Sequence, residues 1–564
     1  MNDRDHATLA LAKRDAAQLD IRIELRPDDR DGFEIRRDTE GRWVIIGNNP
    51  RSCLWGVYHL QAGGGEGEYH PRFAIRGINV CETLGRHSPE MVTRLIGRMA
   101  RWRMNTLVVH HAYGYRRHAA LIQRLCAQRG IDLIHYLQAP MLFLSDRDAE
   151  FFAKTRDGRL RTPTLANETR LCASDPRAVD RFTVGLSHYL GGDHIQPGDR
   201  VVLIDADGYL FCECPACRCL PPHEQWAKLF EAAQDVVERL DKRLSLHYLA
   251  YVWRYRVPAQ RRMIERLDGV MFDTHQRYRW RSIGQPHDLT AYNQIESQAD
   301  QRAQHLPLNI YLHERLREWR RACAGELYVF ENLMLHGSIS CPQPYTPQLL
   351  ADLDLYEREG VDGVIYEAFE PGIASFADQL GVLSRAAWSD RPAYTSTRLE
   401  RLCCDLREED CPAYHFKNCF NVLSYLTTDR FDGLAALREH LNDPALWDYA
   451  RYLQRFLRQR SPAHLEAVLA HVLAHRDRFD WMFIAFNLVR AVQPPMNSSA
   501  LPTILQQFLT CDKLHDLIEP MADPASTIAQ VIEQLRELLE SVDRGVDSDR
   551  HRDMPTGNRF NRKT

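Results

Sequence analysis

The sequence predicts an α/β protein built on a (β/α)8 TIM barrel, with a small N-terminal α/β domain and a helical C-terminal domain. Eight short, nearly continuously apolar runs recur between residues 72 and 390, as expected of parallel strands that are buried on both faces. Segments with helical spacing lie between several of these runs. Eight strands that alternate with helices are typical of such a barrel. The predicted strands cover residues 76–80, 106–110, 131–137, 201–207, 245–252, 269–275, 326–332 and 363–369.

Residues 1–70 are predicted to form the small N-terminal α/β domain. A helix over about residues 7–18 leads into three β-rich runs that are separated by turn signals such as Asp-Gly. A second helix begins at Pro50, because proline is tolerated in a first turn and the apolar residues after it follow helical spacing. The three β-rich runs cover residues 21–25, 32–37 and 43–47, and the glycine-rich run 62–71 is predicted to be a linker.

Residues 71–390 are predicted to form the barrel domain. The helix over 88–104 has Ser88 as its N-cap and Pro89 in its first position. A similar helix over 346–360 opens at Thr346 and is closed by Gly360. The connections 138–200 and 276–325 are long for a compact domain, and we interpret them as functional insertions.

Residues 391–540 are rich in leucine, alanine, arginine and aromatic residues with helical spacing, which predicts a helical C-terminal domain. This domain offers a surface for a homodimer. The polar tail 541–564 is predicted to be disordered.

The composition argues against several classes of protein. A net charge of −4 and a pI of about 6.7 give no general attraction to nucleic acid or to membranes, so neither is an expected partner. No run reaches the roughly 18 apolar residues of a membrane span, and the opening MNDRDHATLALAKRDAAQLD lacks the apolar core of a secretory signal. The 15 cysteines do not follow a disulfide scaffold spacing, which indicates mostly free thiols. We therefore expect a cytoplasmic protein.

Active sites in such barrels form at the C-terminal ends of the strands, and this sequence carries carboxylates, imidazoles and aromatic rings there. Sugars are bound by this set, because apolar sugar faces stack on aromatic rings and two carboxyl groups can break the glycosidic bond. Any single acid at a strand end can instead form a cap or a salt bridge. The candidate catalytic residues are Asp207, Asp273, Glu331 and Glu367. The candidate substrate-binding residues are His110, Tyr136, Asp205, Tyr248, Trp253, His275, Arg277 and Asn332.

A metal-dependent barrel hydrolase is the main competing enzyme class. Such a site requires several histidine and aspartate ligands whose side chains point to the same face of the strands. His110 and His111 are adjacent, so they point to opposite faces of an extended strand. Asp273 and His275 are two residues apart and could share a face, which keeps this alternative open.

Several motifs resemble known sugar-cleaving families. The runs DGFEI, VIIGNNP and LWGVYHL, followed by PRFAIRGINV, resemble the region before and into the barrel of alpha-glucuronidases and beta-hexosaminidases. The run DADGYLFCECPACR resembles that of a bacterial group of uncharacterised glycoside-hydrolase-like proteins, which carry D-G followed by C-x-C-P-x-C. The resemblance covers about residues 20–390 and implies the barrel fold.

The resemblance also implies roles for particular residues. Alpha-glucuronidases carry the catalytic acid as a glutamate near the end of strand 4, and Asp207 takes that position here with a shorter side chain. The runs FDTHQR and FENLMLHG are similar to the base side of that family, which implies Asp273 and Glu331 and a water-mediated inverting reaction. Beta-hexosaminidases use an adjacent Asp-Glu pair on strand 4, which this sequence lacks. Glu367 has no counterpart in the resemblance, but its position suits a base or a substrate contact.

Four cysteines follow the fourth strand within eight residues: Cys212, Cys214, Cys217 and Cys219. Four thiolates can bind a structural zinc ion, although ligands this close in the chain strain a tetrahedral wrap, and Cys172 or His223 could replace one of them. The alternatives are reduced thiols in a tight loop or, less in keeping with the motif, a redox site. A metal here would fix the loop that follows the strand and would not act on the sugar.

The sequence therefore predicts a glycoside hydrolase that acts on small oligosaccharides, including those with an acidic or substituted sugar. Asp207 is the predicted general acid, Glu331 with Asp273 or Glu367 forms the base side, and no cofactor is required for catalysis. His110, His275 and Arg277 are predicted to bind a sugar carboxylate. A non-catalytic carbohydrate-binding barrel and a metal-dependent hydrolase are the alternatives.

Overall fold

The computed structural model describes residues 2–28, 30–80, 89–144, 146–161, 170–206, 211–275, 277, 281–286, 306–332, 346–367 and 380–390, with a few single residues between 448 and 471. The chain divides into two compact units. The first unit contains Met1–Asn442 and Asp477–Asp480, and the second contains Asp443–Arg476 and Trp481–Thr564. The described residues of the second unit are helical, and most of the predicted helical domain, with the whole predicted tail, lies outside the described residues.

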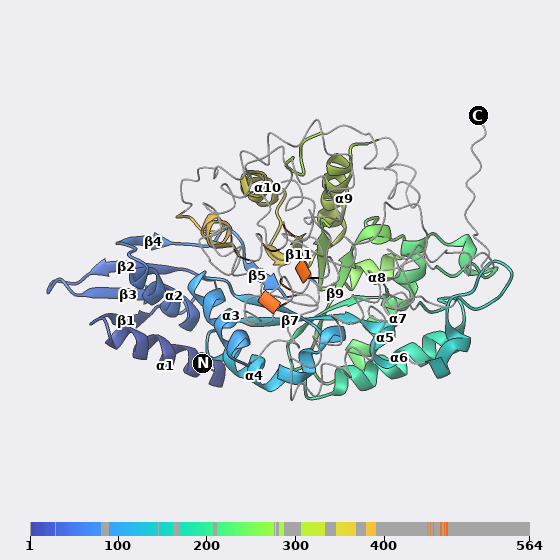
Figure 1. Ribbon diagram of the computed structural model, residues 1–564, viewed down its shortest axis with the longest axis horizontal. Helices are drawn as coiled ribbons and strands as arrows, with labels where there is room; N and C mark the ends of the chain where they lie inside the picture. Colours follow the sequence, from blue (N-terminus) through green and yellow to red (C-terminus); the bar gives the residue numbers. More distant parts are fainter. Residues whose placement is uncertain are drawn as a thin grey trace. The chain divides into compact units, whose positions relative to one another are not determined.

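The first unit contains a closed eight-stranded parallel barrel, which confirms the predicted fold class. The strands follow the order β10-β11-β12-β5-β6-β7-β8-β9 around the barrel, so each strand lies beside its neighbours in the chain. Figure 1 shows β5, β7, β9 and β11 gathered at the centre of this unit, with helices outside them. The strands are β5 (Ile75–Asn79), β6 (Thr106–His110), β7 (Asp132–Gln138), β8 (Arg200–Ile204), β9 (Ser245–Ala250), β10 (Gly269–Asp273), β11 (Glu326–Asn332) and β12 (Gly363–Glu367).

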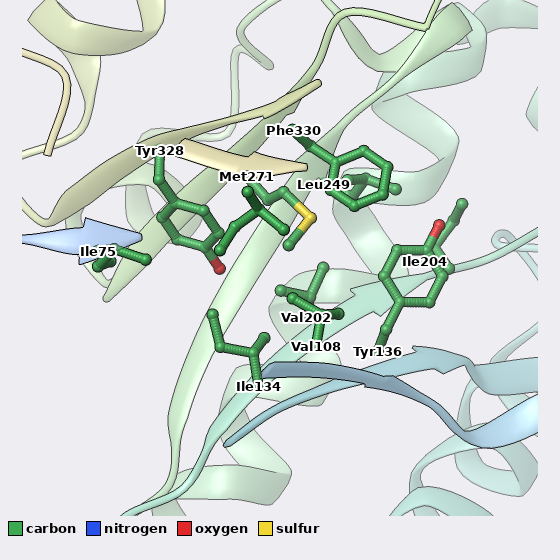
Figure 2. Packing of buried hydrophobic residues seen from close by; sticks show 11 residues of the cluster. Ile75, Val108, Ile134, Tyr136, Val202, Ile204, Leu249, Met271, Tyr328 and Phe330 are labelled. Atoms are coloured by element: carbon green, nitrogen blue, oxygen red, sulfur yellow. The ribbon is translucent and has the colours of Figure 1, made fainter. Parts of the chain in front are cut away.

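Alternate residues of the strands fill the inside of the barrel. Figure 2 shows side chains from different strands pointing toward one another in this interior core. Side chains alternate between the two faces of a strand. The residues two and four positions after each core residue therefore also face the inside of the barrel. The core residues are Ile75, Val108, Ile134, Tyr136, Val202, Ile204, Leu249, Met271, Tyr328, Phe330 and Ile365.

Helices surround the barrel, as the alternation predicts. Thr346 opens α10, and Gly360, at φ +70°, follows its end in the left-handed conformation that favours glycine. The two predicted insertions contain helices α5 and α6 in the first and α9 in the second. None of the described helices is long and apolar enough to cross a membrane. The helices are α3 (Pro89–Arg101), α4 (Tyr115–Ala127), α5 (Ala139–Phe143), α6 (Pro176–Gly191), α7 (Pro222–Arg239), α8 (Arg261–Glu265), α9 (Leu308–Ala322) and α10 (Thr346–Arg358).

The N-terminal region contains two helices and a four-stranded sheet of order β1-β3-β2-β4. Asn49 caps α2 through the amide of Ser52, and Pro50 stands in its first turn, as predicted. The run predicted to be a linker contains β4, whose Tyr69 ring stacks on Phe33 with ring centroids 4.9 Å apart. The four glycines of this run and the strand's length of three residues gave no strand signal in the sequence. The elements are α1 (Asp3–Ala17), β1 (Arg22–Leu25), β2 (Phe33–Arg37), β3 (Trp43–Gly47), α2 (Pro50–Gln61) and β4 (Gly67–Tyr69).

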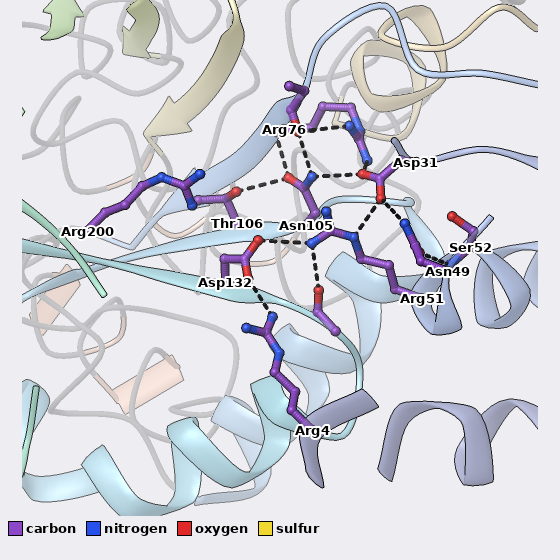
Figure 3. Close-up of polar contacts among 12 residues, drawn as sticks. Arg4, Asp31, Asn49, Arg51, Ser52, Arg76, Asn105, Thr106, Asp132 and Arg200 are labelled. Atoms are coloured by element: carbon purple, nitrogen blue, oxygen red, sulfur yellow. Dashed lines mark hydrogen bonds and ion pairs between the residues drawn. The ribbon is translucent and has the colours of Figure 1, made fainter. Parts of the chain in front are cut away.

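Asp31 joins the N-terminal region to the start of the barrel strands (Figure 3). Its carboxylate accepts hydrogen bonds from Arg51 at 2.7 Å, Arg76 at 2.9 Å and Asn105 at 3.1 Å. Burial raises the pKa of Asp31, but the positive charges of Arg51 and Arg76 outweigh it and lower the pKa to about 2. Arg51 also pairs with Asp132 of β7 at 2.9 Å. This network lies at the N-terminal ends of the strands, away from the expected active site.

Candidate active site

Among the residues that the structure describes, seven polar or aromatic ones face inward at the C-terminal ends of the barrel strands. Their inward direction follows from alternation with the core residues below them. Asn332, Glu367 and Asn79 are paired in register on neighbouring strands, so their side chains share one level. We call this set the barrel mouth: Asn79, His110, Gln138, Tyr251, Asp273, Asn332 and Glu367.

Asp273, the last residue of β10, is held by two donors. Its Oδ1 accepts the backbone N–H of His275 at 2.6 Å and the side-chain amide of Asn332 at 3.3 Å. Hydrogen bonds to a carboxylate restrict its orientation and favour its ionised form. Asp273 is 5% exposed, so these donors matter more than they would in water. The structure therefore brings Asp273, His275 and Asn332, all predicted site residues, into one cluster.

Glu367, the last residue of β12, lies between two side-chain amides. Asn332 of β11 and Asn79 of β5 are its register partners on either side. The Oδ1 atom of Asn79 is buried and has no hydrogen-bond partner among the described residues. A buried acceptor without a partner costs free energy unless a ligand satisfies it. A hydroxyl group of a bound molecule is a suitable donor for Asn79.

Aromatic and imidazole rings lie at two places around the barrel mouth, on β6 and β7 and after β9 and β10. The rings of His110 and Tyr136 lie 4.5 Å apart, and those of Tyr251 and His275 lie 5.8 Å apart. After β9, Val252 has a φ of +52°, which strains a β-branched residue and is a feature that clusters at functional sites. Val252 opens the short 3-10 helix Val252–Arg254.

The ring of Trp253 meets Phe211 edge-on, with 5.9 Å between the ring centroids. Trp253 follows Val252 directly, so the strained turn after β9 carries this ring. It joins His110, Tyr136 and His275 among the predicted aromatic and imidazole contacts at this end of the barrel.

Asp205, predicted to bind substrate, forms a buried ion triad instead. Its two oxygens accept hydrogen bonds from Arg170 and Arg254, and both guanidinium groups also bond to the carbonyl of Ala206. Asp205 follows the inward-facing Ile204, so its side chain lies on the outer face of β8. Its carboxylate holds two arginines in place. Sequence reasoning missed both arginines because they come from different connections of the barrel.

Glu331 and Arg277, predicted for catalysis and for substrate binding, also lie outside the barrel mouth. Glu331 precedes the inward-facing Asn332 and therefore points to the outer face of β11. Its carboxylate accepts bonds from Arg277 at 2.8 Å and Thr274 at 2.7 Å, and from the hydroxyl of Tyr356. Arg277 is 0% exposed and pairs with Asp352 as well, at 2.5 Å. These groups form a buried ion network behind the barrel.

Tyr248, a predicted substrate contact, packs against helices. It precedes the inward-facing Leu249, and its ring lies 5.2 Å from Phe230 of α7 and 5.1 Å from Trp319 of α9. Its side chain is fully buried between strand and helices. The predicted general acid Asp207 lies outside the described residues.

Sequence reasoning missed Asn79 and Gln138 as members of the barrel mouth. Both are the last residues of their strands, and each stands two or four residues after a core residue of the same strand. Strict counting of alternate residues from Ile75 and Ile134 would have found them.

The cysteine cluster contains Cys172, one of the two replacements that the sequence offered, in place of Cys219. The Sγ atoms of Cys172, Cys212, Cys214 and Cys217 lie within 4.8 Å of one another. Cys219 is exposed, and its thiol donates to the carbonyl of Pro215 at 3.5 Å, so Cys172 takes its place in the cluster. Among the described residues this is the one group of three or more potential metal ligands.

No family model and no curated protein matches the sequence. Among solved structures, the chain is similar to a chitobiase from Flavobacterium johnsoniae, at 10% identity and a TM-score of 0.47, with 94% of this chain and 91% of that chain covered. It is also similar to a family 89 glycoside hydrolase from Clostridium perfringens, at 11% identity and a TM-score of 0.48, with 96% and 75% covered. A GH20 exo beta-N-acetylglucosaminidase from Vibrio harveyi matches at 12% identity and a TM-score of 0.43, with 72% of each chain covered.

Proposed function

We propose that this chain is a glycoside hydrolase that acts on small oligosaccharides at the barrel mouth. The observation that carries the proposal is the pair of buried carboxylates, Asp273 and Glu367, which face inward from β10 and β12 with one strand between them. Hydrolysis of a glycosidic bond needs a proton donor and a carboxylate that activates water or attacks the sugar, and this pair supplies the carboxylate side. Asn79 and Asn332 supply amides for sugar hydroxyls beside this pair.

The aromatic residues support a sugar ligand. Tyr251 and Trp253, just after β9, offer ring faces where apolar sugar faces stack, and Tyr136 lies one inward layer below the end of β7. His110 and His275 offer nitrogen donors that suit an acidic sugar, whereas Arg277 is committed to its own ion network. An acidic or substituted sugar therefore stays part of the proposal, with the histidines as its contacts.

The roles of the carboxylates follow from the chemistry of the reaction. One carboxyl group protonates the leaving oxygen, and the other activates water or attacks the sugar carbon. Asp207 follows β8 by three residues in the sequence, and β8 lies opposite β12 in the closed ring order. We keep Asp207 as the proposed proton donor and assign Glu367 and Asp273 to the base side. The cytoplasmic location and a homodimer stay predictions.

A metal-dependent hydrolase would need ligands beyond those that the described part of the chain assembles at the barrel mouth. Asp273 and His275 come together there, but no third ligand joins them among the described residues. We therefore place the carboxylate mechanism first.

The test is a turnover assay on a panel of aryl glycosides and oligosaccharides that includes uronic acids. We expect Asp273→Asn and Glu367→Gln each to lower kcat by about 10²–10⁴-fold, the usual contribution of a positioned acid or base. Glu331→Gln serves as the matched control, because it removes a carboxylate from the same strand ends but not from the barrel mouth. Sugar binding without turnover in the wild-type chain would overturn the proposal in favour of a non-catalytic binding barrel.

A further inference from the structure

We propose that Cys172, Cys212, Cys214 and Cys217 bind a structural zinc ion. Their sulfur atoms lie within 4.8 Å of one another, and Cys172 Sγ is 3.7 Å from Cys214 Sγ and 3.8 Å from Cys217 Sγ. Four thiolates around zinc at about 2.3 Å place neighbouring sulfurs about 3.8 Å apart in a regular tetrahedron. Both Cys172 separations equal an edge of that tetrahedron, and the other sulfur pairs lie within 4.8 Å, so the cluster is close to the size that a zinc ion requires.

The ligands come from two separate segments of the chain. The backbone therefore does not have to bring four ligands from only eight consecutive residues around one ion. Cys212, Cys214 and Cys217 follow β8, whereas Cys172 belongs to the connection between β7 and β8. The spacing C-x-x-C of Cys214 and Cys217 is typical of one half of a zinc site. Cys212 is the third ligand, and Cys172 supplies the fourth.

Backbone amides point at the sulfur atoms. The N–H of Lys154 donates to Cys212 Sγ at 3.3 Å, and the N–H of Cys217 donates to Cys214 Sγ at 3.4 Å. Donors to metal-bound thiolates stabilise their negative charge and orient them. The side-chain amide of Gln225 braces the same loop by bonding to the carbonyls of Cys212 and Cys217, each at 3.1 Å.

A cluster of small apolar thiols is the plain alternative, because free cysteines are among the most buried residues. Three of the four side chains are buried, and they pack with Ala153. Apolar packing alone does not require four sulfurs within 4.8 Å of one another with backbone amides directed at two of them. Cys214 is partly exposed and a groove lined by Ala173, Ser174, Ala216 and Leu220 flanks the cluster, so an ion has a path from solvent.

The ion would fix two neighbours of the barrel mouth. Arg170 lies two residues before Cys172 and bonds to Asp205 and to the carbonyl of Ala206. Phe211 precedes Cys212, stacks under the guanidinium of Arg170 at 4.1 Å and meets Trp253. Zinc would therefore hold these strand-end loops in one conformation. Its removal should increase the mobility of the Arg170 and Phe211 side chains together.

The experiment measures metal content of the full chain by mass spectrometry after growth with added zinc. We expect about one zinc per chain in the wild type and in Cys219→Ser, whose sulfur lies outside the cluster. Cys172→Ser should bind zinc at least about 100-fold more weakly, because loss even of an outer contact costs 10–100-fold. Equal zinc content in Cys172→Ser and Cys219→Ser would overturn the proposal, as would one equivalent of iron in place of zinc.

A second measurement covers the case in which Cys172→Ser fails to fold. The wild-type chain is stripped with a chelator and titrated with Co²⁺ alone. Tetrahedral thiolate ligation predicts intense visible bands together with thiolate-to-metal charge-transfer absorption, and Zn²⁺ should displace the Co²⁺. A folded apo chain that binds no Co²⁺, or binds it with the pale spectrum of an octahedral oxygen site, would overturn the proposal. Neither readout depends on hydrolase activity.

Discussion

The side-chain amide of Asn332 donates to Oδ1 of Asp273 at 3.3 Å, across the neighbouring strands β11 and β10. Both residues face the barrel mouth, and Asp273 is nearly inaccessible to solvent. The contact links a proposed catalytic carboxylate to a neutral donor that cannot take its proton. Asn332 is therefore a positioning residue for Asp273.

Replacing Asn332 with leucine removes the donor while keeping the size of the side chain. We expect kcat/KM to fall about 10–100-fold, because a hydrogen bond to a charged group contributes about 1.5–3 kcal/mol. The ascending limb of the pH–activity profile should move to higher pH, since the lost donor favoured the ionised carboxylate. A loss of activity with an unmoved pH profile would restrict Asn332 to substrate binding.

Glu331 and Glu367 are both acids at strand ends, but we expect opposite effects when each is changed to glutamine. Glu331→Gln leaves the buried Arg277 with only part of its counter-charge, so the free energy of unfolding should fall by about 3 kcal/mol while kcat of the folded fraction stays within about tenfold. Glu367→Gln should lower kcat far more, by about 10²–10⁴-fold. Denaturant unfolding and turnover are measured on the same preparations. Native stability with abolished turnover in Glu331→Gln would return the catalytic role to Glu331.

The eight strands could be predicted because each is an apolar run buried on both faces, a signal that is local in the sequence. The face on which a strand-end residue lies was harder to predict. An offset of one residue moves a side chain from the inside of the barrel to the outside, which separates Asn332 from Glu331. The strand-end position alone does not tell these two residues apart.

Contacts between distant segments could not be predicted from local patterns. Cys172 reaches Cys214 across 42 residues, and Arg254 reaches Asp205 across 49. No periodicity or turn signal encodes such pairs, because they depend on how the connections fold over the strand ends. The same holds for Asp31, whose partner Arg76 is 45 residues away.

Asp31 gives a prediction about acid stability. Its pKa in the folded chain is about 2, below the value of about 3.9 expected in an unfolded chain. Its stabilising contribution is therefore complete above pH 4 and is lost as the pH falls through 2, by about 2–3 kcal/mol. Asp31→Asn should lower the free energy of unfolding at neutral pH by about 3–5 kcal/mol, since Arg51 and Arg76 lose their shared partner.

The check for Asp31 is denaturant unfolding between pH 2 and 7. Asp31→Asn should lack the part of the slope between pH 4 and 2 that the wild type has. Asp180→Asn, a change to an exposed aspartate on α6, is the control and should follow the wild-type curve. If the free energy of unfolding had the same pH slope in Asp31→Asn and in the wild type, Asp31 would not be the ionised partner of Arg51 and Arg76.

His247 gives a second prediction about how the free energy of unfolding depends on pH, over a higher pH range than that of Asp31. Burial inside the barrel, with a smaller effect of Arg200, lowers its pKa to about 3, and its Nδ1 lies 3.0 Å from the hydroxyl of Tyr328. An unfolded histidine titrates near 6.5, so between about pH 6.5 and 3 the unfolded chain binds a proton that the folded chain does not. The free energy of unfolding should therefore fall as the pH drops through this window, at up to about 1.4 kcal/mol per pH unit.

Replacing His247 with asparagine removes this titration and should flatten the stability curve between pH 6.5 and 3. The slope should shrink without vanishing, because burial also lowers the pKa of His111 and lowers that of His194 to about 4. His188→Asn, at an exposed position of α6, is the matched control and should keep the wild-type slope. Denaturant unfolding at several pH values measures the three curves. A His247→Asn curve that runs parallel to the wild type would mean that His247 takes up its proton in the folded chain as readily as in the unfolded one.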